Sequence, residues 1–147
     1  MPGEEILFVD DEKSVRILVE MSLSRAGYHV TTIAGGEEAL ALVHERTFDV
    51  MLTDLKMPGM SGEELLERVR TVAPDLEVIV VTAYPAFSSA IRAIRAGVSD
   101  YVLKPFDLNH LELAVRRCLE RKQLRAAAAT HRAFSTGRMR RTYPTSE

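Results

Sequence analysis

The chain has 147 residues, 46% of them hydrophobic, a size that allows one domain with a short extension but excludes a second domain. Residues 1–115 carry 10 basic and 19 acidic side chains (net charge −9), whereas residues 116–147 carry 9 basic and 2 acidic ones (net charge +7). An acidic globular part therefore precedes a basic tail. The single cysteine, Cys118, excludes an internal disulfide, and the four histidines lack the spacing of a zinc site.

Short apolar or β-branched runs alternate with segments whose apolar residues recur at helical spacing, and glycine, proline and capping residues separate them. In chain order we predict a strand at 6–9, a helix at 14–26, a strand at 29–33, a helix at 37–46, a strand at 48–53, a helix at 61–73, a strand at 76–81, a helix at 88–96, a strand at 100–103 and a helix from 108 to about 124. Beyond residue 124 the apolar pattern fades, and we expect residues 125–147 to be a flexible basic tail or linker.

Strand and helix alternate five times, which indicates an α/β fold with a five-stranded parallel sheet and helices on both faces. Right-handed crossovers leave few topologies, and the doubly wound, flavodoxin-like order 2-1-3-4-5 is the leading one. That order makes strands one and three neighbours, so it gathers polar residues from four strand ends at one edge of the sheet. These residues are Asp10, Asp11, Asp54, Thr82 and Lys104.

Three carboxylates from adjacent strand ends would repel one another. At ~5 Å and an effective dielectric of ~20, each pair costs about 3 kcal/mol. A hard divalent cation would offset this repulsion, because Mg²⁺ prefers oxygen ligands and often joins one or two carboxylates to a phosphate. Lys104 would add a fixed cation on the opposite side. An aspartate beside a metal, a hydroxyl and a lysine is equipped for phosphoryl transfer.

These strand ends resemble those of a known family, the receiver domain of two-component response regulators. The resemblance covers about residues 4–124 and rests on elements that occur in the same order at the strand ends. They are Asp10-Asp11 after strand one, Asp54 followed by Met57-Pro58-Gly59 after strand three, Thr82-Ala83 after strand four and Lys104-Pro105 after strand five.

The resemblance implies that Asp54 accepts a phosphoryl group from a sensor histidine kinase or phosphotransfer protein and becomes an aspartyl phosphate. It implies that Asp11, Asp54 and the main-chain carbonyl of Lys56 bind Mg²⁺, with Asp10 acting mostly through water. Thr82 and Lys104 would each bind a phosphoryl oxygen. The chain would then be a signalling domain that catalyses only its own phosphorylation and slow dephosphorylation, not an enzyme with external substrates.

The resemblance also implies an output surface. Tyr101 matches the family's aromatic switch residue, which moves inward as the residue matching Thr82 moves toward the phosphate. This movement changes the surface of helix four, strand five and helix five, and it favours a symmetric dimer. A cis peptide bond between Lys104 and Pro105 is typical of the family. Lys56 and Tyr84 would flank the phosphoryl group.

The output partner and the chain's context stay open. The chain is either a single-domain regulator or part of a longer one whose effector domain lies elsewhere. We expect no direct nucleic-acid binding by the basic tail, because it offers neither a recognition helix nor stacking aromatics. We also expect no membrane partner and a cytoplasmic location, because Asp10 and Asp11 interrupt the N-terminal apolar run.

Two functional alternatives are weighed against a phosphorylated receiver. One is a pseudo-receiver, an interaction module that works without phosphorylation, although such modules usually lack part of the residue set that is complete here. The other is a phosphatase with an aspartyl-phosphate intermediate. We would expect that enzyme to carry a second aspartate two residues after the nucleophile, and position 56 is a lysine.

Overall fold

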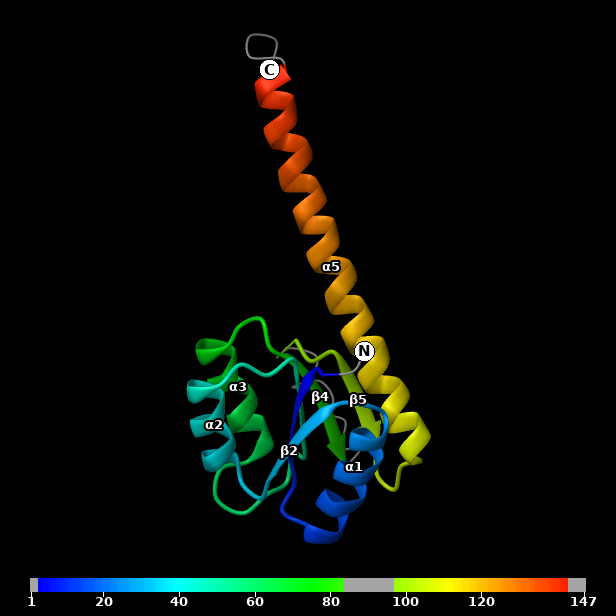
Figure 1. The fold of residues 1–147 in the computed structure, drawn as a ribbon. Coiled ribbons are helices and arrows are strands. Elements are labelled where there is room, and N and C mark those ends of the chain that lie inside the picture. The colour runs from blue at the N-terminus through cyan, green and yellow to red at the C-terminus, as the bar shows by residue number, and fades with distance from the viewer. Residues whose placement is uncertain (1–2, 84–96, 143–147) are drawn as a thin grey trace.

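The computed structural model describes residues 3–83 and 97–142, with side chains up to Ala129. Five parallel strands form one sheet in the order β2-β1-β3-β4-β5, which confirms the predicted flavodoxin-like topology (Figure 1). The described elements are β1 (Glu5–Val9), α1 (Lys13–Arg25), β2 (His29–Ile33), α2 (Gly36–Glu45), β3 (Val50–Thr53), α3 (Gly62–Val72), β4 (Glu77–Thr82), β5 (Asp100–Leu103) and α5 (Leu108–Thr142). The helix predicted at 88–96 lies outside the described residues.

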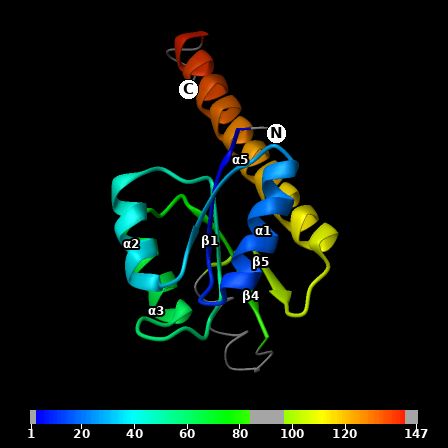
Figure 2. The ribbon, with the colours of Figure 1, turned by 60° about the horizontal axis from the view of Figure 1, so that its bottom comes forward.

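The sheet is covered on both faces, so its strands read as continuous apolar runs. Figure 2 shows α1 and α5 on one side of the sheet and α2 and α3 on the other. Successive residues of β1 serve the two cores alternately: Phe8 packs on the side of α1 and α5, and Leu7 packs on the side of α2 and α3. Two packed cores therefore hold the strand ends at one edge in fixed register. Within the described residues, no helix combines the length and apolar character that a membrane span needs.

The last helix is longer than the sequence analysis expected. We placed its end near residue 124 with a flexible tail beyond, but α5 continues to Thr142 and extends past the α/β body (Figure 1). The run Ala126–Ala129 explains the difference, because alanine is the strongest helix former. Its preference for the helix does not require an apolar face that packs against the sheet. The spacing of apolar residues indicates a helix only where one face of it is buried. It therefore gives no signal for the part of α5 that extends beyond the sheet.

Three cations fix the direction of α5 where it leaves the domain. Arg121 donates to the carbonyl of Ser99 at 3.1 Å, and Lys122 donates to the carbonyl of Asp49 at 3.3 Å. Arg125 forms an ion pair with the carboxylate of Glu77 at the start of β4. These contacts hold the helix against the N-terminal ends of β3, β4 and β5, at the edge of the sheet opposite to the acidic cluster.

The Glu77 carboxylate should make stability depend on pH in the acidic range. Burial raises its pKa, but hydrogen bonds from Ser99 and Arg125 and the charges of Arg125 and Lys122 outweigh burial and hold the pKa below its usual value of 4.5. A lowered pKa means that the stabilisation is complete above the unfolded-state value and is lost as pH falls through the folded-state value.

We therefore expect wild type to lose about 1 kcal/mol more than Glu77→Gln between pH 6 and pH 3, because Arg125 is partly exposed and the pair is screened. Urea unfolding at a series of pH values measures the difference. The exposed Glu67→Gln serves as the matched control, and its pH profile should follow that of wild type. Parallel profiles for wild type and Glu77→Gln would contradict the expectation.

Candidate functional site

Two aspartates are buried side by side where β1 and β3 end. The last residues of the two strands, Val9 and Thr53, are paired in register, and the hydrogen bonding continues one residue further because the N–H of Asp54 donates to the Val9 carbonyl at 3.1 Å. Asp10 is fully buried and Asp54 is 5% exposed, whereas Asp11 is exposed. One carboxylate oxygen from each of the three lies within 4.8 Å of the others. The structure therefore brings together the three acids that the sequence placed at this edge.

Lys104 lies within this cluster rather than opposite it. Its ammonium donates to Oδ2 of Asp10 at 2.6 Å and to Oδ2 of Asp54 at 2.8 Å, so one cation bridges the two buried carboxylates. The Lys104 side chain is only 11% exposed. The backbone N–H of Lys104 donates to the carbonyl of Thr82 at 2.8 Å, and the peptide bond to Pro105 is cis. Repulsion between Asp10 and Asp54 is thus offset by a protein cation.

The pKa shifts follow from this arrangement. Burial lowers the pKa of Lys104, but the hydrogen bonds and negative charges of Asp10 and Asp54 outweigh burial and raise the pKa well above its ordinary value. Burial raises the pKa of Asp10, and the Lys104 ammonium and the Glu12 N–H counteract that rise only in part. Lys104 is therefore a permanent cation, and the site holds positive charge beside its two buried carboxylates.

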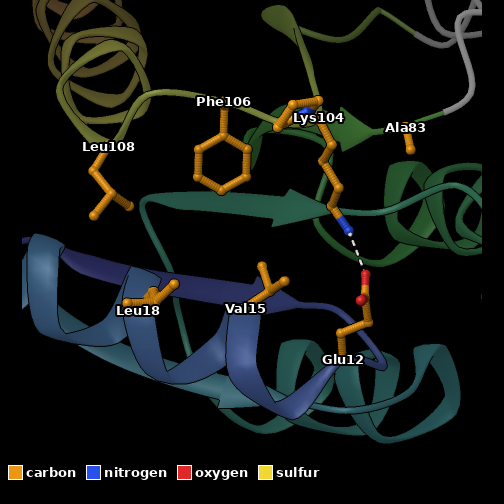
Figure 3. Close-up of a pocket in the computed structure, with 8 residues that line it drawn as sticks. Glu12, Val15, Leu18, Ala83, Lys104, Phe106 and Leu108 are labelled. Atoms are coloured by element: carbon orange, nitrogen blue, oxygen red, sulfur yellow. Dashed lines mark hydrogen bonds and ion pairs between the residues drawn. The ribbon is translucent and has the colours of Figure 1, made fainter.

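Backbone groups orient both buried carboxylates. The N–H of Lys56 donates to Oδ1 of Asp54 at 3.2 Å, and the N–H of Glu12 donates to Oδ1 of Asp10 at 2.9 Å. Arg16, in the first turn of α1, donates to the Asp10 carbonyl at 2.7 Å. Sequence reasoning missed Arg16, since its only signal is its position one helical turn after Glu12. It also missed Glu12, whose exposed carboxylate lies 3.4 Å from the Lys104 ammonium (Figure 3).

The predicted switch residues lie on the neighbouring strands. Thr82 is fully buried at the end of β4, where it pairs with Leu103 of β5. Tyr101 is half-buried on β5, and its pKa is raised first by burial and then by the charges of Asp54 and Glu63. Tyr84 lies outside the described residues.

An apolar groove opens beside Lys104. It has a volume of about 420 Å³ and lies between the start of α1 and the segment that joins β5 to α5. Figure 3 shows Phe106 and Leu108 facing Val15 and Leu18 across it, with Lys104 and Glu12 at one end. A partner that fills the groove would therefore lie directly beside the acidic cluster.

The residues present fit a Mg²⁺ ion. Three carboxylates from two adjacent strand ends supply oxygen ligands, the atoms that Mg²⁺ prefers, and exposed Asp11 leaves one side of the set open to water. The Lys104 ammonium, which contacts Oδ2 of Asp10 and Oδ2 of Asp54, adds a cation to the same cluster. The cluster therefore combines oxygen ligands for a metal with a fixed positive charge at Asp54.

The comparison with known families decides what this arrangement is. The sequence model of the response regulator receiver domain matches residues 6–116. The chain belongs to this family. The chain is 39% identical over 115 residues to the DNA-binding transcriptional regulator NtrC of Salmonella typhimurium. The matched region covers 78% of this chain and 24% of NtrC. Because the chain spans about a quarter of that relative, the match does not extend to the remainder of NtrC.

Solved structures agree with the assignment of the receiver domain. A CheY-like receiver domain from Methanospirillum hungatei superposes with a TM-score of 0.81 at 30% identity, covering 83% of this chain and 98% of the other. The response regulator TrrA of Thermotoga maritima, solved in complex with Mg²⁺ and BeF, superposes with a TM-score of 0.73 at 34% identity, covering 79% and 99%. The family resemblance read from the strand ends is thereby confirmed.

Proposed function

We propose that this receiver domain accepts a phosphoryl group on Asp54 in a Mg²⁺-dependent reaction, with a sensor histidine kinase or phosphotransfer protein as the donor. The observation that carries the proposal is the position of the Asp54 carboxylate, which is buried, bridged through Lys104 to Asp10 and grouped with Asp11. A cluster of this kind, with a fixed ammonium and hard oxygen ligands, suits a reaction in which charge spreads over phosphoryl oxygens.

In the proposed reaction an oxygen of Asp54 attacks the phosphorus of a phosphohistidine, the P–O bond forms as the P–N bond breaks, and the imidazole leaves with the bonding pair and takes up a proton. Asp10, Asp11, Asp54 and the Lys56 carbonyl would hold Mg²⁺, which neutralises charge on the phosphoryl oxygens when bound. The Lys104 ammonium passes from the Asp54 carboxylate to a phosphoryl oxygen, and the Thr82 hydroxyl donates to another.

The donor would approach over the apolar groove beside Lys104. Its walls, Val15 and Leu18 on α1 and Phe106 and Leu108 before and in α5, would receive an apolar helix of the donor protein and bring its phosphohistidine to the site. The groove ends at Lys104 and Glu12, next to Asp54. This position favours direct transfer over release of free phosphate.

The output of the phosphorylated state would pass through Thr82 and Tyr101 to the surface around β5 and α5, which a downstream effector or a second phosphorylated copy recognises. We propose that the protein acts in the cytoplasm as a signalling domain and turns over no external phosphoester. The lysine at position 56 stands where an aspartyl-phosphate phosphatase would need a second acid. The alternative of a phosphorylation-independent interaction module has no support in the comparisons.

The direct test is intact-mass spectrometry after incubation with acetyl phosphate, with and without Mg²⁺, beside an Asp54→Asn control. We expect one phosphoryl adduct on wild type that requires Mg²⁺ and is absent from Asp54→Asn. An adduct that persists in the control would place the acceptor elsewhere. No adduct under any condition would reject phosphorylation and leave the interaction module as the better account.

A further inference from the structure

Thr53 places a buried hydroxyl at the end of a strand whose other residues are all apolar. The three residues before it in β3, Val50–Leu52, are buried hydrophobic residues of the two cores, and Thr53 itself is fully buried. A buried hydroxyl costs free energy unless it forms a hydrogen bond. Its partner here is the carbonyl oxygen of the next residue, Asp54, at 2.9 Å. A polar group at this position therefore acts on the backbone of the proposed phosphoacceptor.

The Asp54 carbonyl is confined from a second side by Gly62, the first residue of α3. A Cβ atom on Gly62 would lie 1.9 Å from this carbonyl oxygen and 2.8 Å from its carbon, so no side chain fits there. The N–H of Gly62 also donates to the Leu55 carbonyl at 2.9 Å, and the Ser61 hydroxyl caps α3 by accepting the Glu64 N–H at 3.1 Å. The start of α3 is thus held against the peptide that follows Asp54.

The chain after Asp54 returns a hydrogen bond to the Asp54 carboxylate. The Asp54 carbonyl belongs to the peptide that joins Asp54 to Leu55, and the N–H of the next peptide, that of Lys56, donates to Oδ1 of Asp54. A rotation of the Asp54 carbonyl away from the Thr53 hydroxyl would shift Leu55 and, with it, this N–H. The carbonyl of Lys56, which the family resemblance assigns to the metal, would move as well.

We propose that Thr53 is a positioning residue for Asp54. Its hydroxyl holds the Asp54 carbonyl in the space that Gly62 leaves free, and this contact fixes both the carboxylate and the Lys56 backbone for metal binding and phosphoryl transfer. The role of Thr53 in phosphorylation rests on the proposed function. The effect of Thr53 on Mg²⁺ binding is measurable without any phosphodonor.

The test compares Thr53→Val, which keeps the shape and loses the hydroxyl, with Thr53→Ser, which keeps the hydroxyl. The rate of adduct formation is measured against acetyl phosphate concentration, and Mg²⁺ affinity is measured by calorimetry without phosphodonor. We expect Thr53→Val to lower the maximal rate about tenfold with an unchanged half-saturating concentration, and to weaken Mg²⁺ binding severalfold. Thr53→Ser should recover both quantities to within about twofold. Thr71→Val, on the exposed side of α3, is the matched control and should behave as wild type.

Unfolding in chelator separates positioning from loss of the fold, because Thr53→Val removes one hydrogen-bond donor from the Asp54 carbonyl, a local cost that lowers the melting temperature without abolishing the folded state. A slower Thr53→Val that still unfolds in one cooperative transition supports the inference, and equal rates and Mg²⁺ affinities in wild type and Thr53→Val overturn it. If wild type accepts no phosphoryl group, the proposed function fails, and Mg²⁺ affinity alone decides the role of Thr53. If wild type also binds no Mg²⁺, both proposals are rejected.

Discussion

Replacing Lys104 with methionine should lower the free energy of unfolding by about 3–5 kcal/mol in a chelating buffer. Methionine keeps most of the aliphatic length of lysine but removes the ammonium that lies 2.6 Å from Asp10 and 2.8 Å from Asp54. Both carboxylates are almost completely buried, so neither regains enough water to compensate. The loss therefore reflects two buried charges left without a countercharge more than the net stabilisation that the ion pairs provide.

Urea unfolding in EDTA and in Mg²⁺ measures this effect. We expect the loss to be smaller in Mg²⁺, because a cation bound by the same carboxylates replaces part of the missing charge. Adding Asp54→Asn to Lys104→Met should restore part of the stability in EDTA, since one uncompensated charge is removed. Lys13→Met, an exposed lysine at the start of α1, is the matched control and should change stability little. A Lys104→Met protein as stable as this control would show that the buried carboxylates do not depend on Lys104.

Gly62→Ala should destabilise the domain by about 3 kcal/mol, the upper end of what overpacking costs. The added Cβ would lie 1.9 Å from the Asp54 carbonyl oxygen, and that atom belongs to the backbone at the end of a buried strand. Either α3 must move away from β3 or the peptide after Asp54 must turn. Both movements displace the Asp54 carboxylate, so we expect phosphorylation by acetyl phosphate to fall by at least tenfold.

Gly35→Ala is the control for this substitution. Gly35 precedes α2, and an added Cβ there would meet nothing closer than a Glu38 carboxylate oxygen at 4.0 Å. Gly35→Ala should lower the free energy of unfolding only by the loss of a glycine N-cap, which is much less than the loss expected for Gly62→Ala. Chemical denaturation and the acetyl phosphate assay are run on both variants. Equal stability and equal phosphorylation of the two would mean that the close approach of Gly62 to Asp54 has no consequence.

The fold and the acidic cluster were predictable because parallel strands bring their carboxyl ends to one edge. Once β1 and β3 are neighbours, Asp10 and Asp54 must lie close together whatever their side chains do. Strand boundaries were less accurate: the third strand was predicted from residue 48, but β3 begins at Val50. Phe48 is buried in the core before the strand starts, and an apolar run reports burial rather than backbone pairing.

The sequence did not predict the contacts that orient the site. These contacts are hydrogen bonds between residues far apart in the chain or between a side chain and the backbone, and they depend on side-chain rotamers and on the path of the loops. The sequence placed Lys104 at the right edge, but its bridging position between Asp10 and Asp54 follows from the path of the chain after β5. The role of Thr53 depends on its own rotamer and on the peptide next to it. No spacing in the sequence distinguishes this threonine from an ordinary strand residue.

The length of α5 gives the domain a lever arm. From its last described anchor at Arg125 to its end at Thr142, the helix runs on for about 25 Å. A tilt of about 5° at the root would displace the far end by about 2 Å over that distance. Glu77, which holds Arg125, begins the strand that ends at Thr82 in the site. A shift at the edge that holds Asp54, too small to remodel the domain surface, would thus be magnified at the tip of the helix, far from where the shift began.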